Sequence, residues 1–330
     1  MDNVTHSLTG LALSRAGLNR VAPHAAWILL LAANAPDIDV VSLIHGSPAY
    51  LCHHRDFTHA IAFVPLLAVL PVLLVRLFVR APFAWKRAYL VSLAGVATHP
   101  ALDWLNTYGV RLMQPFSPQW FQAGTTHVVD LWMWAVLVTA ALWPLLSRLV
   151  SSEIGVRTGS AGRGIAIFAL AFLVVYNSGR YVLRERAVAV LDARLYHGRA
   201  PLRVAAFPHS ANPFRWVGLV EGESFHMRHD VDLLGEFDPT AGQTYYKPEP
   251  RPALEAARQT APFREFLRFS QYPYWRVAPL DEPEGALLVE AMDLRFGPPS
   301  NPRFVAAAVV DGTNLVRRAS FRFRGNRNRQ

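Results

Sequence analysis

Long apolar stretches alternate with short polar loops over the first half of the chain, which predicts membrane-spanning helices there. Residues 60–79 and 128–149 are each apolar over the ~20 residues that a helix needs to cross a bilayer. Residues 88–105 form a third apolar stretch, and residues 164–176 reach the length of a span only if residues 177–182 are included. We therefore predict three or four membrane spans.

The two N-terminal apolar segments are too short to cross a membrane alone. Residues 4–16 and 24–35 both fall short of the ~20 apolar residues of a span, and a turn-like G-L-N-R sequence separates them. A re-entrant or strongly tilted helical hairpin fits these lengths. Pro36 should stop the second helix and present Asp37 and Asp39 just beyond it.

The pattern changes after residue 184, where prolines and arginines become frequent and no further span is seen. Short alternating runs predict strands at residues 202–207, 214–220, 224–231, 287–296, 304–310 and 315–323. A helix is expected at 261–269, a Pro-rich loop at 237–258 and a frayed basic tail at 325–330. The predicted fold class is mainly α: a helical integral membrane domain of residues 1–184, with the re-entrant hairpin and the spans, followed by a small α+β extramembrane domain of residues 185–330.

The distribution of basic residues predicts the orientation in the membrane. Loops 76–87 and 148–163 hold seven Lys and Arg residues, Arg80 and Arg157 among them, whereas segments 37–60 and 106–127 hold two. Cytoplasmic loops carry the excess of Lys and Arg, so the first pair of loops is expected in the cytoplasm and the second pair outside. The C-terminal domain is expected on the outer side as well.

Composition supports a membrane protein and argues against other classes. Hydrophobic residues make up 52% of the chain and charged residues only 17%. The net charge of +9 is spread over loops and the C-terminal third without a basic, aromatic-interleaved patch, so we expect no nucleic acid partner. The single cysteine, Cys52, excludes an intrachain disulfide framework, and the polar start predicts no cleavable signal peptide.

Histidine and aspartate residues recur at helical spacing within these apolar segments. His99 and Asp103 are four residues apart, and His127 and Asp130 are three apart, so each pair would share one face of a helix if both stretches are helical. Ionisable residues inside membrane segments are costly and therefore mark functional sites. Imidazole and carboxylate groups at this spacing are the ligands of a catalytic divalent metal.

More potential ligands lie at the same predicted depth. The residues at the predicted outer ends of their segments are Asp37, Asp39, His53, His54, His59, His99, Asp103, His127 and Asp130. Four histidines directly follow a threonine: His6, His59, His99 and His127. At least four histidines and four aspartates in one leaflet exceed what one ion uses, so two or three ions bridged by a carboxylate are expected. Imidazole with carboxylate suits zinc, and a carboxylate-rich variant suits manganese or magnesium.

Other interpretations of these residues remain open. Each histidine taken alone is more simply a core residue satisfied by a neighbouring helix. The same ligands could line the pathway of a metal transporter or sensor, although the spans 60–79 and 128–149 show almost no polar residues continuing inward. A scaffold whose helices only anchor an outer domain is a third interpretation. Cys52 beside His53 does not indicate a nucleophile pair, because adjacent side chains rarely point the same way.

Five motifs in order resemble the YdjM family of bacterial inner-membrane proteins, described as membrane-bound metal-dependent hydrolases. They are M-D-N-V-T-H-S-L, A-P-D-I-D, H-R-D-F-T-H-A, T-H-P-A-L-D-W-L-N-T-Y-G and H-V-V-D. N-P-F-R-W at 212–216 and D-L-R-F-G at 293–297 resemble segments of the longer members. The resemblance implies a multi-pass protein of the bacterial inner membrane, with the metal site facing the periplasm.

That family is in turn similar to the zinc-dependent phospholipase C and P1 nuclease group, which holds three metals. The resemblance implies the ligands His6, Asp37 or Asp39, His59, His99 with Asp103, and His127. Two departures bear on the third metal. His127-x-x-Asp130 stands where that group has a longer spacing to glutamate, and its N-terminal amine ligand has no evident counterpart in this sequence.

The residues suggest hydrolysis of a phosphoester, most plausibly on a membrane lipid that is both environment and substrate. Two ions about 4 Å apart bind a phosphoryl group and lower the pKa of a bridging water. Arg55 is expected to clamp phosphate, with an interfacial contact to lipid headgroups as its alternative. Asp39 is a ligand or the base that acts on water, and Asp37 is a ligand or orients a ligand histidine.

Overall fold

The computed structural model describes residues 1–79, 83–154, 162–282 and 284–323, and the chain divides into two compact units. The first unit comprises Met1–Asp39, Arg55–Glu185 and Phe207–Phe214. The second comprises Val40–His54, Arg186–Ala206 and Arg215–Gln330. The predicted single boundary at residue 184 differs from this division in two places. Val40–His54 belong to the second unit, and Phe207–Phe214 belong to the first. Arg80, Arg157 and the predicted tail at 325–330 lie outside the described residues.

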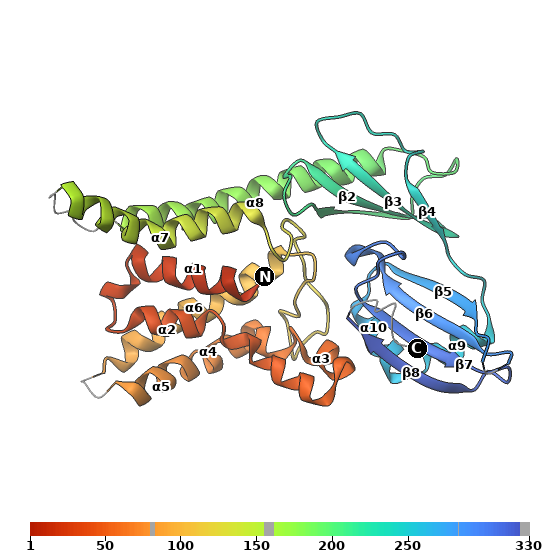
Figure 1. The fold of residues 1–330 in the computed structure, drawn as a ribbon, viewed down its shortest axis with the longest axis horizontal. Helices are drawn as coiled ribbons and strands as arrows, with labels where there is room; N and C mark the ends of the chain where they lie inside the picture. Colours follow the sequence, from red (N-terminus) through yellow and green to blue (C-terminus); the bar gives the residue numbers. More distant parts are fainter. Residues whose placement is uncertain (80–82, 155–161, 283, 324–330) are drawn as a thin grey trace. The chain divides into compact units, whose positions relative to one another are not determined.

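The first unit is built of helices (Figure 1). They are α1 (Asn3–Ala16), α2 (Ala25–Ala32), α4 (Val64–Leu67), α5 (Val69–Phe78), α6 (Trp85–Leu105), α7 (Leu131–Ile154) and α8 (Arg163–Asp192), whose last residues belong to the second unit. Short 3₁₀ helices join several of them: η1 (Leu18–Arg20), η2 (Ala35–His45), η3 (Phe57–His59) and η4 (Ile61–Phe63). Helix α1 begins where the Asp2 carboxylate accepts the N–H groups of Val4 and Thr5, both at 3.0 Å.

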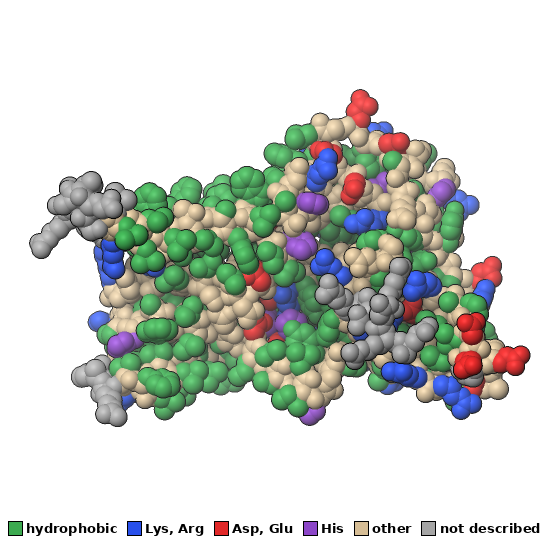
Figure 2. Space-filling view, in the orientation of Figure 1, with side chains coloured by type: hydrophobic (Ala, Val, Ile, Leu, Met, Phe, Trp, Pro, Cys, Tyr) green, Lys and Arg blue, Asp and Glu red, His purple; other side chains and the backbone are tan. Residues whose placement is uncertain are grey.

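Three segments of the described chain are long and apolar enough to cross a membrane. They are Ile61–Phe78, Leu131–Leu149 and Arg163–Asp192, and the pair Ala25–Ala32 and Ala35–His45, bent by 41°, would be a fourth. Large apolar side chains on these helices stay exposed, such as Leu149 at 65% and Val175 at 70%. Hydrophobic side chains accordingly cover much of the helical unit in Figure 2, as expected for a surface that faces lipid.

The span expected at residues 88–105 is not among these candidate segments and stays a prediction. Helix α6 covers them, but it is not among the segments apolar enough to cross a membrane on their own. Its first turn holds Lys86 and Arg87, and its last turns bury His99 and Asp103. We infer that α6 is stabilised by the helices around it, because its polar side chains are buried against protein.

Two further expectations about helix ends need correction. Pro36 does not stop the second helix: α2 already ends at Ala32, and Pro36 lies in the first turn of η2, where a missing N–H costs no hydrogen bond. The span expected at residues 128–149 lies in a helix that begins at Leu131, after His127 and Asp130 rather than around them. The reason is that the Asp130 carboxylate takes the first free N–H groups of α7 and so caps the helix.

Helices α1, α2 and α6 pack at close range because two glycines lie at their contacts. A Cβ on Gly10 would lie 2.7 Å from the carbonyl oxygen of Leu29, and one on Gly95 would lie 2.7 Å from the Cβ of Ala32. Around them, small and branched apolar residues of α2, α5 and α6, such as Ile28 and Leu29, are fully buried. This close packing holds the polar ends of the three helices together.

The second unit contains two four-stranded sheets, each with its strands in chain order. The first sheet comprises β1 (Arg203–Pro208), β2 (Arg215–Glu221), β3 (Phe225–Asp232) and β4 (Gln243–Tyr246), and the second comprises β5 (Pro273–Pro279), β6 (Leu287–Asp293), β7 (Val305–Val310) and β8 (Val316–Arg322). Helices α9 (Pro252–Arg258) and α10 (Ala261–Phe269) pack on the second sheet, and α3 (Ser47–His53) packs on α10 and β8.

The expected strands and the helix at 261–269 are present, but α3, β4, α9 and β5 were not predicted. Strand β4 and helix α9 fall in the region expected to be a Pro-rich loop, and β5 begins and ends in proline. Proline at the first or second position of a helix, as Pro252 of α9, suits the helix start. The prolines of this unit therefore begin elements that the composition alone assigns to loops.

Candidate metal centre

Five titratable side chains from four separate segments meet inside the helical unit. They are His6 of α1, Asp37 of η2, His59 of η3, and His99 and Asp103 of α6. His6, His59, His99 and Asp103 are fully buried, and Asp37 is partly exposed. Two sets of three among them have ligand atoms all within 4.8 Å of one another: His6, His99 and Asp103, and Asp37, His59 and His99.

Carboxylate oxygens of Asp37 and Asp103 approach the point between the ring nitrogens of His59 and His99 at the spacing of metal ligands. His59 Nε2 lies 3.1 Å from His99 Nε2 and 3.3 Å from Asp103 Oδ2, and His99 Nε2 lies 3.6 Å from Asp103 Oδ2. Asp37 Oδ1 lies 3.6 Å from His59 Nε2 and 3.4 Å from His99 Nε2. Bonds of 2.0–2.1 Å to zinc put tetrahedral ligand atoms about 3.3–3.4 Å apart. The five separations therefore match this geometry.

The hydrogen bonds of the two histidines turn lone pairs toward that point. His99 Nδ1 lies 2.6 Å from the carbonyl oxygen of Ala33, which only accepts, so Nδ1 carries the proton and Nε2 presents its lone pair. His59 Nδ1 lies 3.0 Å from Thr58 Oγ1, whose hydroxyl donates to Asp39 Oδ2 at 3.2 Å. Nδ1 therefore donates to the hydroxyl oxygen, with Asp39 Oδ2 at 3.4 Å beside it, and Nε2 presents a second lone pair. Two lone pairs and two carboxylates at this range repel one another unless a cation lies between them.

A second group of ligands lies on the other side of Asp103. Asp103 Oδ1 is 3.4 Å from His6 Nε2 and contacts the amino nitrogen of Met1, while Oδ2 faces the first group. Neither ring nitrogen of His6 has a hydrogen bond in the described part of the chain, although the ring is fully buried and stacks on His99 at 3.7 Å. The two oxygens of Asp103 are thus placed to bridge two ions.

The amino nitrogen of Met1 lies beside the candidate ligands, a contact that the sequence did not indicate. Met1 is 4% exposed, and its nitrogen lies at the carboxylate shared by both ligand groups. Burial, with His99 as the second cause, holds the pKa of His6 well below its usual value. A neutral imidazole is the form that binds a metal, so the environment of His6 suits a ligand.

Arg55 lies at the centre, but its guanidinium contacts protein groups. Its Nε is 3.1 Å from Asp103 Oδ2, and Nη1 donates to Asn106 Oδ1 at 3.0 Å and to the carbonyl of Gly109 at 3.2 Å. The ring of Tyr108 lies 4.6 Å from the guanidinium carbon. Arg55 therefore offsets the charge of Asp103 in this structure.

The two aspartates after α2 have different positions. Asp37 faces the ligand nitrogens of His59 and His99, whereas Asp39 accepts the backbone N–H of Arg55 at 2.9 Å and lies at the outer nitrogen of His59. Of the alternatives open from the sequence, the geometry favours Asp37 as the ligand and Asp39 as the residue that orients His59.

Two residues predicted to bind metal are placed differently. Asp130 caps α7, with hydrogen bonds of 3.1 and 3.2 Å from the N–H groups of Trp132 and Met133, and it accepts from Tyr176 Oη at 3.2 Å. His127 is half-buried and belongs to neither ligand group. His54, in the second unit, stacks its ring on Tyr50 at 4.5 Å, and its assignment as a ligand stays a prediction.

Asn106 supports the site, and sequence reasoning assigned it no role. Its Oδ1 accepts from Arg55 and from the backbone of Tyr108 at 2.8 Å, and its Nδ2 lies 3.3 Å from Asp103 Oδ1. The signal was present: Asn106 follows Asp103 by three residues, within the motif that carries His99. The amide lies beyond the end of α6 and so does not share the helical spacing by which ligands were sought.

Comparisons with known proteins agree with the membrane assignment. Residues 1–187 match the family described as YdjM inner membrane protein. The chain is also 26% identical to the uncharacterized protein YfhP of Bacillus subtilis (strain 168), over 97% of this chain and 94% of that protein. No solved structure matches the chain. Because the family match covers more than half of the chain and carries the metal centre, this protein belongs to the YdjM family of inner membrane proteins.

Proposed function

We propose that this protein is a membrane-embedded, metal-dependent hydrolase that cleaves a phosphoester of a lipid or lipid-like substrate. The observation that carries the proposal is the buried set of His59, His99, Asp37 and Asp103, whose ligand atoms lie at metal-binding distances with lone pairs facing one another. A cluster of this kind in a membrane protein is costly without a cation and marks a functional site.

Zinc suits the site best, with manganese or magnesium as alternatives. Imidazole and carboxylate ligands at tetrahedral spacing are those that zinc prefers. His6 with Asp103 Oδ1 supports a second ion beside the first, bridged by Asp103. When bound, such ions lower the pKa of water and stabilise negative charge on a phosphoryl group.

The protein groups around the ligands have supporting roles in this proposal. Asp39 and the carbonyl of Ala33 fix the rings of His59 and His99 and thereby their tautomers. Arg55 neutralises Asp103 at rest and is the group nearest the metals that can bind phosphate oxygens. Asn106 holds the guanidinium in place for that contact.

A lipid substrate is supported by the apolar residues near the ligands along the chain. Phe57, two residues before His59, is 45% exposed, and Ile61, two residues after it, is 58% exposed. The N–H of Ile61 donates to Leu112 at 3.0 Å, which ties the start of the span Ile61–Phe78 to the loop that bears the exposed Phe116. Arg55 and the ligand His59 thus lie at the end of a span, where phospholipid headgroups are found.

The transporter interpretation has less support. A pathway for ions needs polar groups that continue from the ligands along the helices. Clusters of Ala, Ile, Leu and Val lie between α2, α5 and α6 and between α2, α4 and α6. The buried polar side chains of α1 and α6 away from the ligands, such as Thr9 and Ser92, are hydroxyl groups without charge.

The test is metal content and turnover of the purified protein. Protein in detergent should hold one to two zinc ions per chain by mass spectrometry and should release product from phospholipids or a chromogenic phosphodiester. His99→Ala and Asp103→Ala should lose both metal and activity, whereas His45→Ala, an exposed histidine on η2, should keep both. Wild-type protein without stoichiometric metal would refute the proposal, and metal without turnover on any phosphoester would favour the scaffold.

A further inference from the structure

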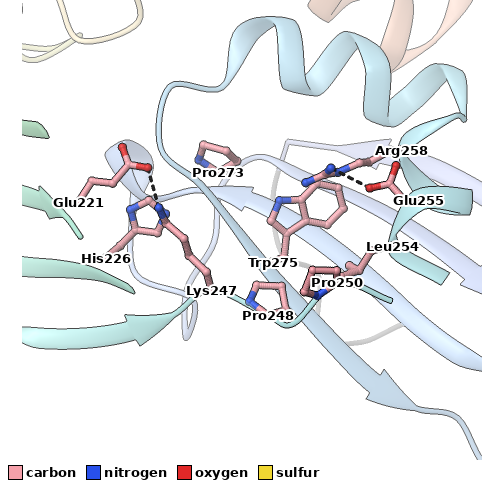
Figure 3. A pocket seen from close by; sticks show the side chains of 10 residues that line it. All are labelled: Glu221, His226, Lys247, Pro248, Pro250, Leu254, Glu255, Arg258, Pro273 and Trp275. Atoms are coloured by element: carbon pink, nitrogen blue, oxygen red, sulfur yellow. Dashed lines mark hydrogen bonds and ion pairs between the residues drawn. The ribbon is translucent and has the colours of Figure 1, made fainter. Parts of the chain in front are cut away.

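A separate cavity of about 320 Å³ lies within the C-terminal unit (Figure 3). It is lined from β2, β3, β5, α9 and the chain that follows β4, all within the second unit. Its volume is at the lower end of the range for small-molecule sites. None of its residues belongs to the metal centre, so the cavity calls for an explanation of its own.

One end of the cavity is polar and rich in both donors and acceptors. Glu221 pairs with Lys247 at 2.9 Å, and Lys247 also donates to the carbonyl of Gly222 at 2.9 Å. Arg203 donates to the other Glu221 oxygen at 3.0 Å. Glu221 is therefore shared by Lys247, which lines the cavity, and by Arg203, which is not among the lining residues.

His226 gives this end a polar atom that the protein leaves unsatisfied. The residue is 2% exposed, and its Nδ1 has no hydrogen-bond partner among the described residues. Burial lowers the pKa of His226 to about 4, so the ring is neutral at physiological pH and offers one donor and one acceptor. A buried polar atom without a partner is costly, and a polar ligand in the adjoining cavity would supply one.

The opposite end holds rigid apolar side chains beside an ion pair. Trp275 is 7% exposed there: Phe263 stacks on its ring at 5.4 Å, and the guanidinium of Arg258 lies over the ring at 5.1 Å. Arg258 is itself paired with Glu255 at 2.9 Å. Figure 3 shows Pro248 and Pro250 on the way from Lys247 to this end. Aromatic and proline faces are rigid surfaces on which a flat C–H face of a ligand packs with little loss of entropy.

We propose that this cavity is a binding site for a neutral saccharide of one or two sugar rings. A pyranose ring has a flat C–H face for the Trp275 end and hydroxyl groups that both donate and accept for the Glu221, Lys247 and His226 end. The cavity volume fits one or two rings. Charge selects against other small ligands: Lys247 and Arg258 each have a carboxylate partner, so no cation is left for an anion such as phosphate.

The experiment uses the full chain in phosphatidylcholine nanodiscs, because detergents with sugar headgroups would compete. Glucose, N-acetylglucosamine and cellobiose are titrated and observed by saturation-transfer NMR of their own ring protons. At least one should show saturable transfer, whereas inorganic phosphate and glycine should not compete with it. His226→Phe, which keeps the ring, and Lys247→Met should each weaken binding at least tenfold.

Glu265→Gln is the matched control, because Glu265 forms a comparable ion pair with Arg268 on α10 away from the cavity. It should bind as the wild type does, and circular dichroism and melting temperature should show that all variants fold. If a cavity variant fails to fold, Glu221→Gln replaces it. No saturable transfer with any of the sugars, competition by phosphate or glycine, or tenfold weakening in Glu265→Gln would each overturn the proposal. None of these outcomes depends on the metal centre.

Discussion

His59 Nε2 and His99 Nε2 lie 3.1 Å apart in a fully buried position, although the hydrogen bonds of both rings direct lone pairs toward this gap. Helix α6 supplies one ring and the short helix η3 supplies the other, so residues forty positions apart in the chain form the contact. A proton or a metal ion between the two nitrogens is needed to make this contact favourable. The nearby carboxylates of Asp37 and Asp103 favour a divalent ion over a proton.

Removal of the metal should therefore destabilise the helical unit. A bound ion at a free concentration 100 times its Kd adds about 2.7 kcal/mol to the free energy of unfolding. Treatment with 1,10-phenanthroline should lower the melting temperature of the detergent-purified protein, and added zinc should restore it. His99→Ala should melt at the same temperature with and without the chelator. A wild-type protein whose melting temperature ignores the chelator would contradict a metal in this position.

Close helix packing should be as necessary to the site as the ligands are. Gly95 lies one turn before His99, and a Cβ there meets Ala32 at 2.7 Å, so Gly95→Ala must push α2 and α6 apart. We expect a loss of about 1–3 kcal/mol in stability and reduced zinc content. Gly179→Ala is the control, since a Cβ at that position of α8 meets nothing within 4 Å. The control should retain zinc, and equal loss in both variants would exclude the packing explanation.

Much of this site could be predicted from the sequence, because its ligands lie on regular or motif-bearing segments. The spacing of His99 and Asp103 gives one face of a helix directly, and the observed α6 places both in the centre. The Thr-His dipeptides pointed to His6 and His59 for a weaker reason, namely recurrence. What brought these residues together is the contact of α1, α2 and α6 at two glycines, which no local pattern specifies.

The predictions about His127 and Asp130 depend on the residue at which α7 begins. His127 and Asp130 have helical spacing, but the aspartate is itself the residue that starts α7, so the spacing never becomes a shared face. Short polar side chains before an apolar run are caps at least as often as they are ligands. In the C-terminal unit, prolines concealed α9 and β5 for a similar reason, because Pro252 and Pro273 begin these elements.

Substitutions can distinguish the helix-capping role of Asp130 from the metal-binding role proposed for Asp103. Asp130→Asn keeps a capping side chain and should change neither zinc content nor stability by much, whereas Asp130→Ala should lose about 1 kcal/mol of stability and still bind zinc. Asp103→Asn should lose zinc, because an amide is a poor bridge between two ions. Mass spectrometry and thermal unfolding of the three variants distinguish a cap from a ligand. Loss of zinc in Asp130→Asn would return that residue to the metal site.

The proposed orientation can be tested with single cysteines in a chain in which Cys52 is replaced by alanine. Phe116 is 83% exposed in the loop after α6. In cells with a permeable outer membrane, a Phe116→Cys variant should be labelled by a membrane-impermeant maleimide. Lys86, in a loop rich in basic residues, should be labelled only after the inner membrane is broken. The reverse pattern would place the metal centre at the cytoplasmic side.

The stability of the C-terminal unit should decrease as the pH is lowered, because protonation of His226 favours the unfolded chain. Burial is the main cause that lowers its pKa to about 4, Lys247 and Arg203 add to it, and Glu221 and Asp293 oppose it. The unfolded chain has the ordinary pKa of about 6.5 and binds a proton first as pH falls. This contribution is therefore complete above pH 6.5, declines between pH 6.5 and 4, and changes no further below.

At pH 5 the loss from this one residue is about 2 kcal/mol, which for a unit of this size lowers the melting temperature by about 4–8 °C. Other groups titrate over the same range, so the comparison is with His226→Asn, which cannot take up the proton. Thermal unfolding at pH 7 and at pH 5 should show a larger decrease in the wild type than in this variant. Equal decreases would mean that His226 takes up a proton in the folded unit as readily as in the unfolded chain.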